Sequence, residues 1–165
     1  MSLFQALQAR KARILFVCLG NSVRSQMAEA FAKVHGGDVA ETASAGLTPA
    51  PKVAGKAVIA MQEKGISLAG KFPRGMSAVD LSSFDLVINM SGFALPKVPG
   101  VELTMTIKDP MGRDLTEYRR VRDEIEQAVR DLVAHLRSAR QVPRPMVMGT
   151  AVRKPDAAIT ATAAR

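Results

Sequence analysis

The chain is short of cysteine, aromatic side chains and long apolar runs, and each shortage excludes a class of protein. Its 165 residues include one cysteine, Cys18, so an internal disulfide and a thiolate-rich metal site are both excluded. No apolar run reaches the roughly 18 residues that cross a bilayer, and the first eight residues lack the pattern of a secretory signal. We therefore expect a cytoplasmic protein without a membrane segment, a metal or another cofactor.

The positive charge is concentrated at the two ends of the chain. The net charge is +8, but residues 1–13 hold three cations and no acid, and residues 138–165 hold five cations and one acid. Basic ends can contact nucleic acid, but aromatic side chains that would stack on bases make up only 4% of the chain. We expect no nucleic-acid partner. We expect a basic N-terminal extension over residues 1–12, one domain over residues 13–137, and a basic tail rich in proline and alanine over residues 138–165.

Apolar runs predict buried strands over residues 14–17, 39–44, 84–90 and 101–107. Helical patterns lie between them and after them. The alternation of strands and helices is typical of an α/β fold, in which a parallel sheet is covered by helices on both faces. We therefore expect a three-layer α/β domain.

Three helices are predicted from apolar residues at helical spacing. The first buries one face after residue 26, the second ends at Gly65, and the third begins after Asp114, with Glu117 completing a capping box. The face of the first helix comprises Met27, Ala30, Phe31 and Val34, and the stripe of the third comprises Tyr118, Val121, Ile125, Val129, Leu132 and Leu136.

The eight residues 18–25 connect the first predicted strand to the first predicted helix. Backbone N–H groups at a helix N-terminus have no partner within the helix, and the helix dipole is positive there, which favours an anion. Arg24 can hold an oxyanion by two parallel hydrogen bonds. Cys18 begins the loop, and a helix N-terminus and an arginine both favour the reactive thiolate. The loop therefore predicts an oxyanion site with its own nucleophile.

Each residue of this loop has an expected task. The thiolate of Cys18 attacks phosphorus and forms a phosphocysteine, while backbone N–H groups and Arg24 stabilise the charge on the oxygens. Gly20 allows close approach of the backbone, Asn21 tolerates a left-handed conformation, and Ser25 can donate its hydroxyl to the thiolate. The expected substrate-binding residues are Leu19, Gly20, Asn21, Ser22, Val23, Arg24 and Ser25.

Asp109 is the candidate for the general acid. Ligands of parallel sheets bind at the carboxyl ends of the strands, where Cys18 ends the first predicted strand and Asp109 follows the fourth. Pro110 restricts the backbone of Asp109 to extended geometry. Asp109 could protonate the leaving group and then activate water. Two other interpretations stay open: Cys18 as a small buried apolar residue, and Asp109 as the start of an ordinary turn.

In order and spacing, these motifs resemble the low-molecular-weight protein tyrosine phosphatases and the thiol-dependent arsenate reductases of the same fold. The resemblance covers residues 13–137 and rests on residues 18–29, 44–46, 85–90 and 109–110. It implies a four-stranded parallel sheet of order 2-1-3-4. It also implies that Cys18 is the nucleophile, Arg24 the oxyanion clamp and Asp109 the general acid. The implied loop-supporting network is Asn21, Ser25 and Ser44.

Departures from the family pattern bear on the function. Residues 90–96 contain no cysteine, so the internal disulfide cascade of thioredoxin-coupled arsenate reductases is excluded. Met111 and Gly112 follow Asp109-Pro110 where many phosphatases carry tyrosines, and Lys71 falls near the position of a loop-supporting histidine.

Three functions remain open. We expect first a cysteine-dependent phosphatase acting on phosphate monoesters, with phosphotyrosine in protein as substrate. The alternatives are a single-cysteine arsenate reductase coupled to an external thiol, and a non-catalytic oxyanion-binding module. The expected partner is a phosphorylated protein or a small oxyanion.

Overall fold

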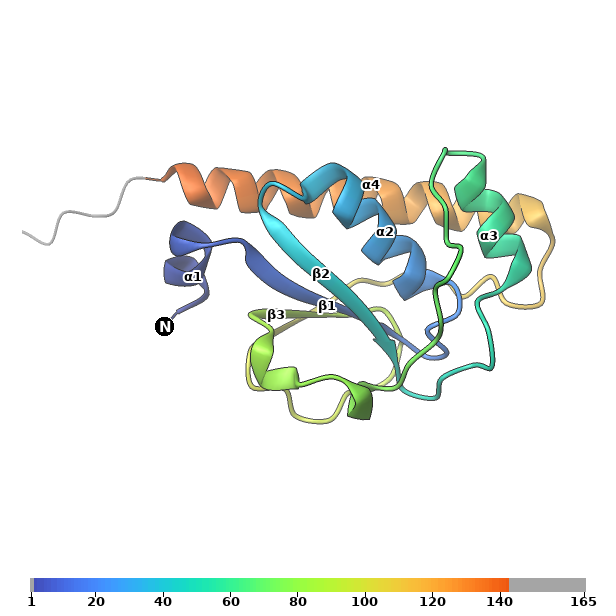
Figure 1. Ribbon diagram of the computed structural model, residues 1–165, viewed down its shortest axis with the longest axis horizontal. Helices are drawn as coiled ribbons and strands as arrows, with labels where there is room; N and C mark the ends of the chain where they lie inside the picture. The colour runs from blue at the N-terminus through green and yellow to red at the C-terminus, as the bar shows by residue number, and fades with distance from the viewer. Residues whose placement is uncertain (1, 143–165) are drawn as a thin grey trace, which may run out of the picture.

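The computed structural model describes residues 2–142 and contains one sheet of four parallel strands in the order β2-β1-β3-β4 (Figure 1). This confirms the predicted α/β fold and strand order. The strands are β1 (Ala12–Cys18), β2 (Ala40–Gly46), β3 (Leu86–Asn89) and β4 (Val101–Thr104). Strands β3 and β4 are shorter than the predicted runs, residues 84–90 and 101–107. After each of them the chain leaves the sheet at the same edge at which Cys18 ends β1.

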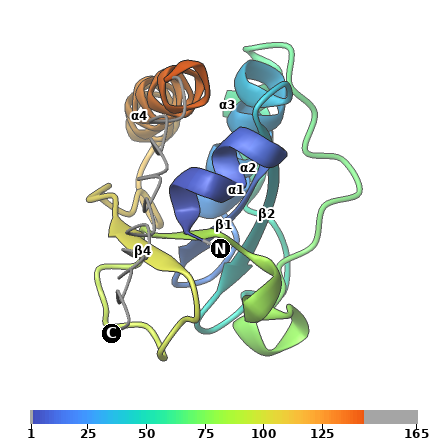
Figure 2. The same cartoon turned by 90° about the vertical axis from the view of Figure 1, so that its left-hand side faces the viewer.

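Helices cover the two faces of the sheet unequally. The α-helices α1 (Leu3–Ala9), α2 (Arg24–Gly36), α3 (Gly55–Gln62) and α4 (Leu115–Gln141) lie on one side, as Figure 2 shows. Two short 3-10 helices, η1 (Met76–Ala78) and η2 (Leu81–Ser83), cover the other face. The larger core therefore lies under the α-helices.

Strand β1 is the centre of both cores. Ile14 and Phe16 pack under the α-helices, whereas Leu15 and Val17 pack toward the 3-10 helices. Side chains alternate between the faces of a strand, so a continuous apolar run is what a strand covered on both faces requires. The burial of β1 fixes its last residue, Cys18, at the carboxyl edge of the sheet.

Helix α2 packs against α4 through a glycine. A Cβ on Gly36 would lie 2.5 Å from Cγ2 of Val133, so only glycine permits this approach. Met27 and Phe31 are fully buried as predicted, but Val34 is 60% exposed. The predicted apolar face was wrong at Val34, because α4 covers the side of α2 that holds Gly36 instead.

The third predicted helix, α4, begins after Asp114, as predicted. The carboxylate of Asp114 accepts the N–H of Glu117 at 3.0 Å, as expected of an N-cap. The reciprocal half of the expected capping box is absent at this helix start, because the Glu117 carboxylate pairs with Arg120 instead.

The N-terminal segment differs from the expected extension. Helix α1 has a capping box formed by Ser2 and Gln5, and Leu7 is 5% exposed in the main core. Arg10 makes two hydrogen bonds to the carboxylate of Asp85 at the start of β3. Residues 2–12 are therefore part of the packed structure.

The domain also extends beyond its expected C-terminal boundary at residue 137. Helix α4 continues to Gln141. The rest of the expected tail, residues 143–165, lies outside the described residues. Within residues 2–142, no helix is both long and apolar enough to cross a membrane.

Candidate active site

The loop after β1 turns its carbonyl groups outward. The carbonyls of Cys18, Leu19, Gly20 and Ser22 accept hydrogen bonds from four backbone N–H groups of segment 47–54, at 2.8–3.0 Å. The N-terminus of α2 has no side-chain cap, so its first amides are left for another acceptor. In the described part of the chain, the backbone N–H groups of residues 19–23 donate no hydrogen bond of this kind, so they are left for another acceptor. This arrangement forms a cradle for an anion.

The sulfur of Cys18 lies at the base of this cradle beside a hydroxyl group. Its Sγ atom is 3.0 Å from Oγ of Ser25, and Cys18 is 2% exposed. Asn21 donates its two Nδ2 hydrogens to Oγ of Ser25 at 2.8 Å and to Oγ of Ser44 at 3.0 Å. Asn21 has a φ of 49°, the left-handed conformation that was anticipated for it. The structure thus brings Cys18, Asn21, Ser25 and Ser44 into one hydrogen-bonded cluster.

Arg24 and Asp109 meet at the rim of the same loop, although 85 residues separate them. Nη1 of Arg24 donates to the carbonyls of Met90 at 2.7 Å and Ile107 at 3.2 Å. Nη2 donates to Oδ2 of Asp109 at 2.8 Å. Three of the five guanidinium hydrogens are thereby used. The Nε hydrogen and one Nη2 hydrogen are left for an oxyanion, and the two carbonyls fix the plane of the group.

The Asp109 carboxylate is held from two sides. Its Oδ1 accepts the N–H of Met111 at 3.0 Å, and its Oδ2 pairs with Arg24. The side chain is 39% exposed, so it lies between the buried arginine and solvent. A proton donor or acceptor at this position can reach both an oxyanion on Arg24 and water.

Gly20 and Gly46 both lie near the loop, but only Gly46 has to be glycine. A Cβ on Gly20 would lie 3.6 Å from Cβ of Ala50, an ordinary van der Waals distance, so the folded loop does not require glycine there. A Cβ on Gly46 would lie 2.8 Å from both the Asn21 nitrogen and the Leu19 oxygen. Gly46, at the end of β2, is therefore the glycine that lets the loop approach the sheet.

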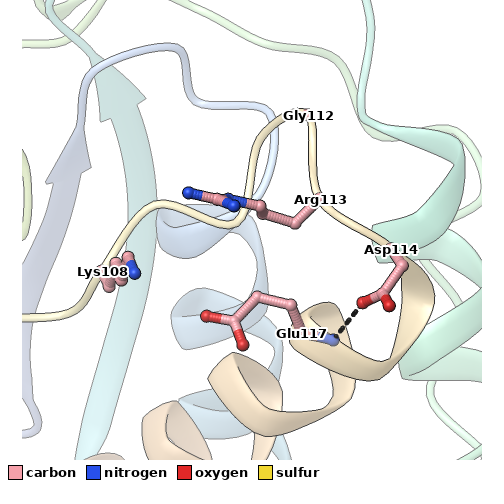
Figure 3. Close-up of a pocket in the computed structure, with 5 residues that line it drawn as sticks. All are labelled: Lys108, Gly112, Arg113, Asp114 and Glu117. Atoms are coloured by element: carbon pink, nitrogen blue, oxygen red, sulfur yellow. Dashed lines mark hydrogen bonds between the residues drawn. The ribbon is translucent and has the colours of Figure 1, made fainter.

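A pocket adjoins the segment that carries Asp109 (Figure 3). It is lined by Lys108, Gly112, Arg113, Asp114 and Glu117, from that segment and from the first turn of α4. Its two cations are balanced by two carboxylates. The Asp114 carboxylate is also engaged in capping α4. The pocket lining does not include Cys18 or Arg24, so the cradle and this pocket are separate features.

The remaining loop residues face in different directions. Leu19 is 37% exposed at the mouth of the cradle, whereas Ser22 and Val23 are buried. The Ser22 hydroxyl donates to the carbonyl of Lys52 at 2.8 Å, so it is used to hold segment 47–54. The side chains of Ser22 and Val23 are therefore engaged in the packing of the loop.

Sequence reasoning missed the groups behind the loop. Glu29 on α2 is 6% exposed and accepts the hydroxyl of Ser44 at 2.6 Å. The backbone N–H of Arg74 donates to Oδ1 of Asn21 at 2.9 Å. Glu29 could have been suspected, because it follows buried positions on a helix close to the loop. A backbone N–H 53 residues away leaves no signal in the sequence.

Comparison with known proteins identifies the family of this chain. The family model described as "Low molecular weight phosphotyrosine protein phosphatase" matches residues 13–142. The chain belongs to this family.

Similar members of the family include both reductases and phosphatases. The chain is 32% identical over 130 residues to a glutaredoxin arsenate reductase of Synechocystis, covering 75% of this chain and 98% of that protein. A solved arsenate reductase in the phosphate-binding state has a TM-score of 0.70 at 31% identity, covering 76% of this chain and 98% of the other. A mutant of the arginine phosphatase YwlE with a phosphorylated active-site serine has a TM-score of 0.64 at 30% identity, covering 76% and 95%.

Proposed function

We propose that this protein is an arsenate reductase that uses Cys18 as its nucleophile and an external thiol as its reductant. The observation that carries the proposal is that Cys18, at the base of the cradle, is the only cysteine in the chain. Similarity to arsenate reductases supports the choice of arsenate as the oxyanion. With no second thiol in the chain, the electrons have to come from outside.

In the first step, the thiolate of Cys18 attacks the arsenic atom of arsenate. An S–As bond forms, one As–O bond breaks, and the departing oxygen takes a proton and leaves as water. We propose Asp109 as the donor of that proton, since its carboxyl group lies beside Arg24. The loop amides and Arg24 hold the remaining oxygens.

In the second step, an external thiolate attacks the sulfur of Cys18. The electron pair of the S–As bond stays on arsenic, which leaves as arsenite, and Cys18 is left in a mixed disulfide with the external thiol. A second external thiolate then releases Cys18 by thiol–disulfide exchange. Two thiols become one disulfide, and arsenic gains two electrons.

The proposal is tested by mixing the protein with arsenate and glutathione, with and without glutaredoxin, and measuring arsenite. We expect arsenite production that depends on the protein and disappears in Cys18→Ser, whose folding is verified by circular dichroism. Trapping of a Cys18–glutathione disulfide by mass spectrometry would support the second step. Absence of arsenite with either reductant, in a protein that hydrolyses an aryl phosphate, would overturn the proposal.

A phosphatase is the second candidate, and one observation favours it. An alcohol or phenol leaving group needs a proton, and the partly exposed carboxyl group of Asp109, which pairs with Arg24 at 2.8 Å, could supply it. Hydrolysis would then proceed through a phosphocysteine, with Asp109 activating the attacking water. The family description and the similarity to an arginine phosphatase support this candidate.

Turnover of para-nitrophenyl phosphate separates the two candidates. A phosphatase should show burst release of the phenol followed by steady hydrolysis, lost in Cys18→Ser. A dedicated arsenate reductase should bind phosphate as an inhibitor and turn over the aryl ester slowly or not at all. Binding of phosphate without either turnover would favour the third interpretation, an oxyanion-binding module.

A further inference from the structure

The pocket beside Asp109 (Figure 3) contains two cations, Lys108 and Arg113, whose side chains form no hydrogen bond or ion pair within residues 2–142. We infer that this pocket binds the carboxylates of the external thiol, so that the reductant is an anionic thiol peptide of the glutathione type and not an uncharged thiol. The inference rests on the proposed arsenate reductase, because only that reaction consumes a thiol.

The backbone on both sides of Lys108 is held by Arg24. The Arg24 guanidinium donates to the carbonyl of Ile107 at 3.2 Å and to the carboxylate of Asp109 at 2.8 Å. Lys108 stands between these two residues, and it is exposed. The pocket therefore begins one residue, or about 3.8 Å along the chain, from the groups that contact the proposed oxyanion clamp.

A tight turn brings Arg113 back to the same place. The N–H of Arg113 donates to the carbonyl of Pro110 at 2.9 Å, and Gly112 has the positive φ, 79°, that the third residue of such a turn requires. The carbonyl of Arg113 accepts a hydrogen bond from the ammonium group of Lys56. The backbone of Arg113 is thus held from two sides, while its side chain extends toward the side of the pocket that holds Lys108 (Figure 3).

The two carboxylates of the pocket are already engaged, unlike its two cations. Asp114 accepts the N–H of Glu117 at 3.0 Å as the cap of α4, and Glu117 accepts two hydrogen bonds from Arg120, at 2.7 and 3.0 Å. These bonds, and then the charges of Lys108 and Arg113, hold the pKa of Glu117 below its ordinary 4.5. The pocket therefore offers two free cations to a ligand, beside carboxylates that have partners.

This charge pattern fits a thiol that carries carboxylates. Glutathione has two carboxylates, which lie about one to two residue lengths, roughly 4–8 Å, from its sulfur. One of them can accept two parallel hydrogen bonds from Arg113, and the other can pair with Lys108. The pocket volume of about 420 Å³ is typical of sites for small ligands. With the carboxylates bound there, the sulfur can be directed past Asp109 toward the oxyanion cradle.

The test is thiol–disulfide exchange of reduced Cys18, which needs no arsenate. The Cys18 thiolate attacks one sulfur of oxidised glutathione, a bond forms between these two sulfurs, the original disulfide breaks, and one glutathione thiolate leaves. The product is the mixed disulfide of the proposed second step, and mass spectrometry gives its rate of formation. The same measurement with hydroxyethyl disulfide, which is uncharged, reports the reactivity of the thiol itself. The ratio of the two rates is the quantity compared.

In Lys108→Met and in Arg113→Met we expect this ratio to fall about two- to fivefold, as for the loss of one exposed ion pair, and about tenfold in the double variant. Lys11→Met is the matched control, because it removes an exposed cation just before β1, at the opposite edge of the sheet from Cys18. Its ratio should equal that of wild type. The same ratio in wild type and the double variant, or an equal fall in Lys11→Met, would overturn the inference.

Arsenate reduction gives a second readout and separates this inference from the proposed function. In the double variant, the KM for glutathione should rise relative to the KM for 2-mercaptoethanol, by about the factor by which the exchange ratio falls. A wild-type protein that forms no arsenite with any thiol, but keeps its exchange preference for glutathione, would contradict the proposed function and support the pocket. Arsenite production with an unchanged KM for glutathione in the double variant would contradict the pocket alone.

Discussion

At the scale of single residues, the position of Asp109 makes a specific prediction about leaving groups. Asp109→Ala removes the carboxyl group beside Arg24 that we propose as the proton donor. For the phosphatase candidate, we expect kcat of aryl phosphate hydrolysis to fall about 10²- to 10³-fold for leaving groups of high pKa, and less than about tenfold for those of low pKa, since good leaving groups need little protonation. The measurement is kcat across a series of substituted phenyl phosphates, with wild type alongside. Equal losses along the series would remove Asp109 from the general-acid role.

Gly46 gives a second residue-scale prediction, with Gly20 as its control. In Gly46→Ala the new methyl group would meet the backbone of the loop after β1, at Leu19 and Asn21, at 2.8 Å, so we expect about 1–3 kcal/mol of destabilisation from overpacking. Gly20→Ala adds a methyl group at 3.6 Å from its nearest neighbour and should change stability by less than about 0.5 kcal/mol. Urea unfolding of both variants is the measurement. Similar stabilities would contradict the assignment.

Whether a residue of the candidate site can be predicted from the sequence depends on whether it contributes its side chain or its backbone. Cys18, Arg24 and Asp109 can be selected from the sequence by side-chain chemistry and by their positions at the ends of predicted elements. The structure pairs Arg24 with Asp109 and pairs Cys18 with Ser25, the residue after Arg24. Gly46 and the Arg74 amide act through backbone contacts made by distant segments. Such contacts depend on how distant segments pack together, and no residue type in the sequence indicates them.

At the scale of elements, Arg122 is a buried polar connection between α4 and the end of α3. It is buried, donates to the carbonyl of Ala60 at 2.9 Å, and pairs with Glu63 at 2.8 Å and Asp123 at 2.8 Å. Arg122→Met keeps much of the packing but leaves the buried Ala60 carbonyl unpaired, at a cost of about 1–3 kcal/mol. We expect a melting temperature lower by several degrees at neutral pH, measured by calorimetry.

The effect of Arg122→Met should depend on pH. Hydrogen bonds from Arg119 and then Arg122 hold the pKa of Glu63 below its ordinary 4.5, and Arg122 holds the pKa of Asp123 below its ordinary 3.8. Groups with a lowered pKa in the folded state stabilise it above their ordinary values, and this stabilisation is lost as the pH falls through the folded values. The stability gap between wild type and variant should therefore be widest above pH 4.5 and narrow in more acidic solution. A gap that widens in acid would contradict this account.

Strand order and helix α1 are two features that could not be predicted from sequence patterns alone. The strand order came from resemblance and not from periodicity, because periodicity does not say which strands are neighbours. Helix α1 was overlooked although Ser2 and Gln5 have the spacing of a capping box. Its seven residues are too few for a periodic pattern, and its burial comes from contact with α4, more than 100 residues away.

At the scale of the whole molecule, α1 and the cradle lie at opposite ends of the sheet. Helix α1 precedes β1, and Arg10 binds Asp85 just before β3, whereas Cys18 ends β1. Leu7→Ala should cost about 2 kcal/mol or more from the cavity it leaves, and lower the melting temperature by at least about 4 °C. We expect kcat and KM to stay within twofold of wild type. Phe4→Ala, at a residue that is 38% exposed, is the control with little effect. A large change of KM in Leu7→Ala would show that the two ends are coupled.

The preference between phosphatase and arsenate reductase is a whole-molecule question that residue patterns did not decide. Both reactions begin with attack by Cys18 and differ in what arrives next, either water activated by Asp109 or a thiol from outside. The sequence favoured the phosphatase because every group for hydrolysis is present. The comparisons give more support to the reductase, which the lone cysteine permits only with an external reductant.

Because Cys18 is the only cysteine, it also determines how the protein reacts with oxidants. Peroxide converts a thiolate to a sulfenic acid, which is rescued when another thiol condenses with it, and is otherwise carried on to the irreversible sulfinic acid. Cys18 has no second cysteine in its own chain to perform that rescue. Its recovery from peroxide therefore depends on the thiol pool around it. Brief peroxide treatment should be reversible when glutathione is present during exposure and permanent when glutathione is added only afterwards.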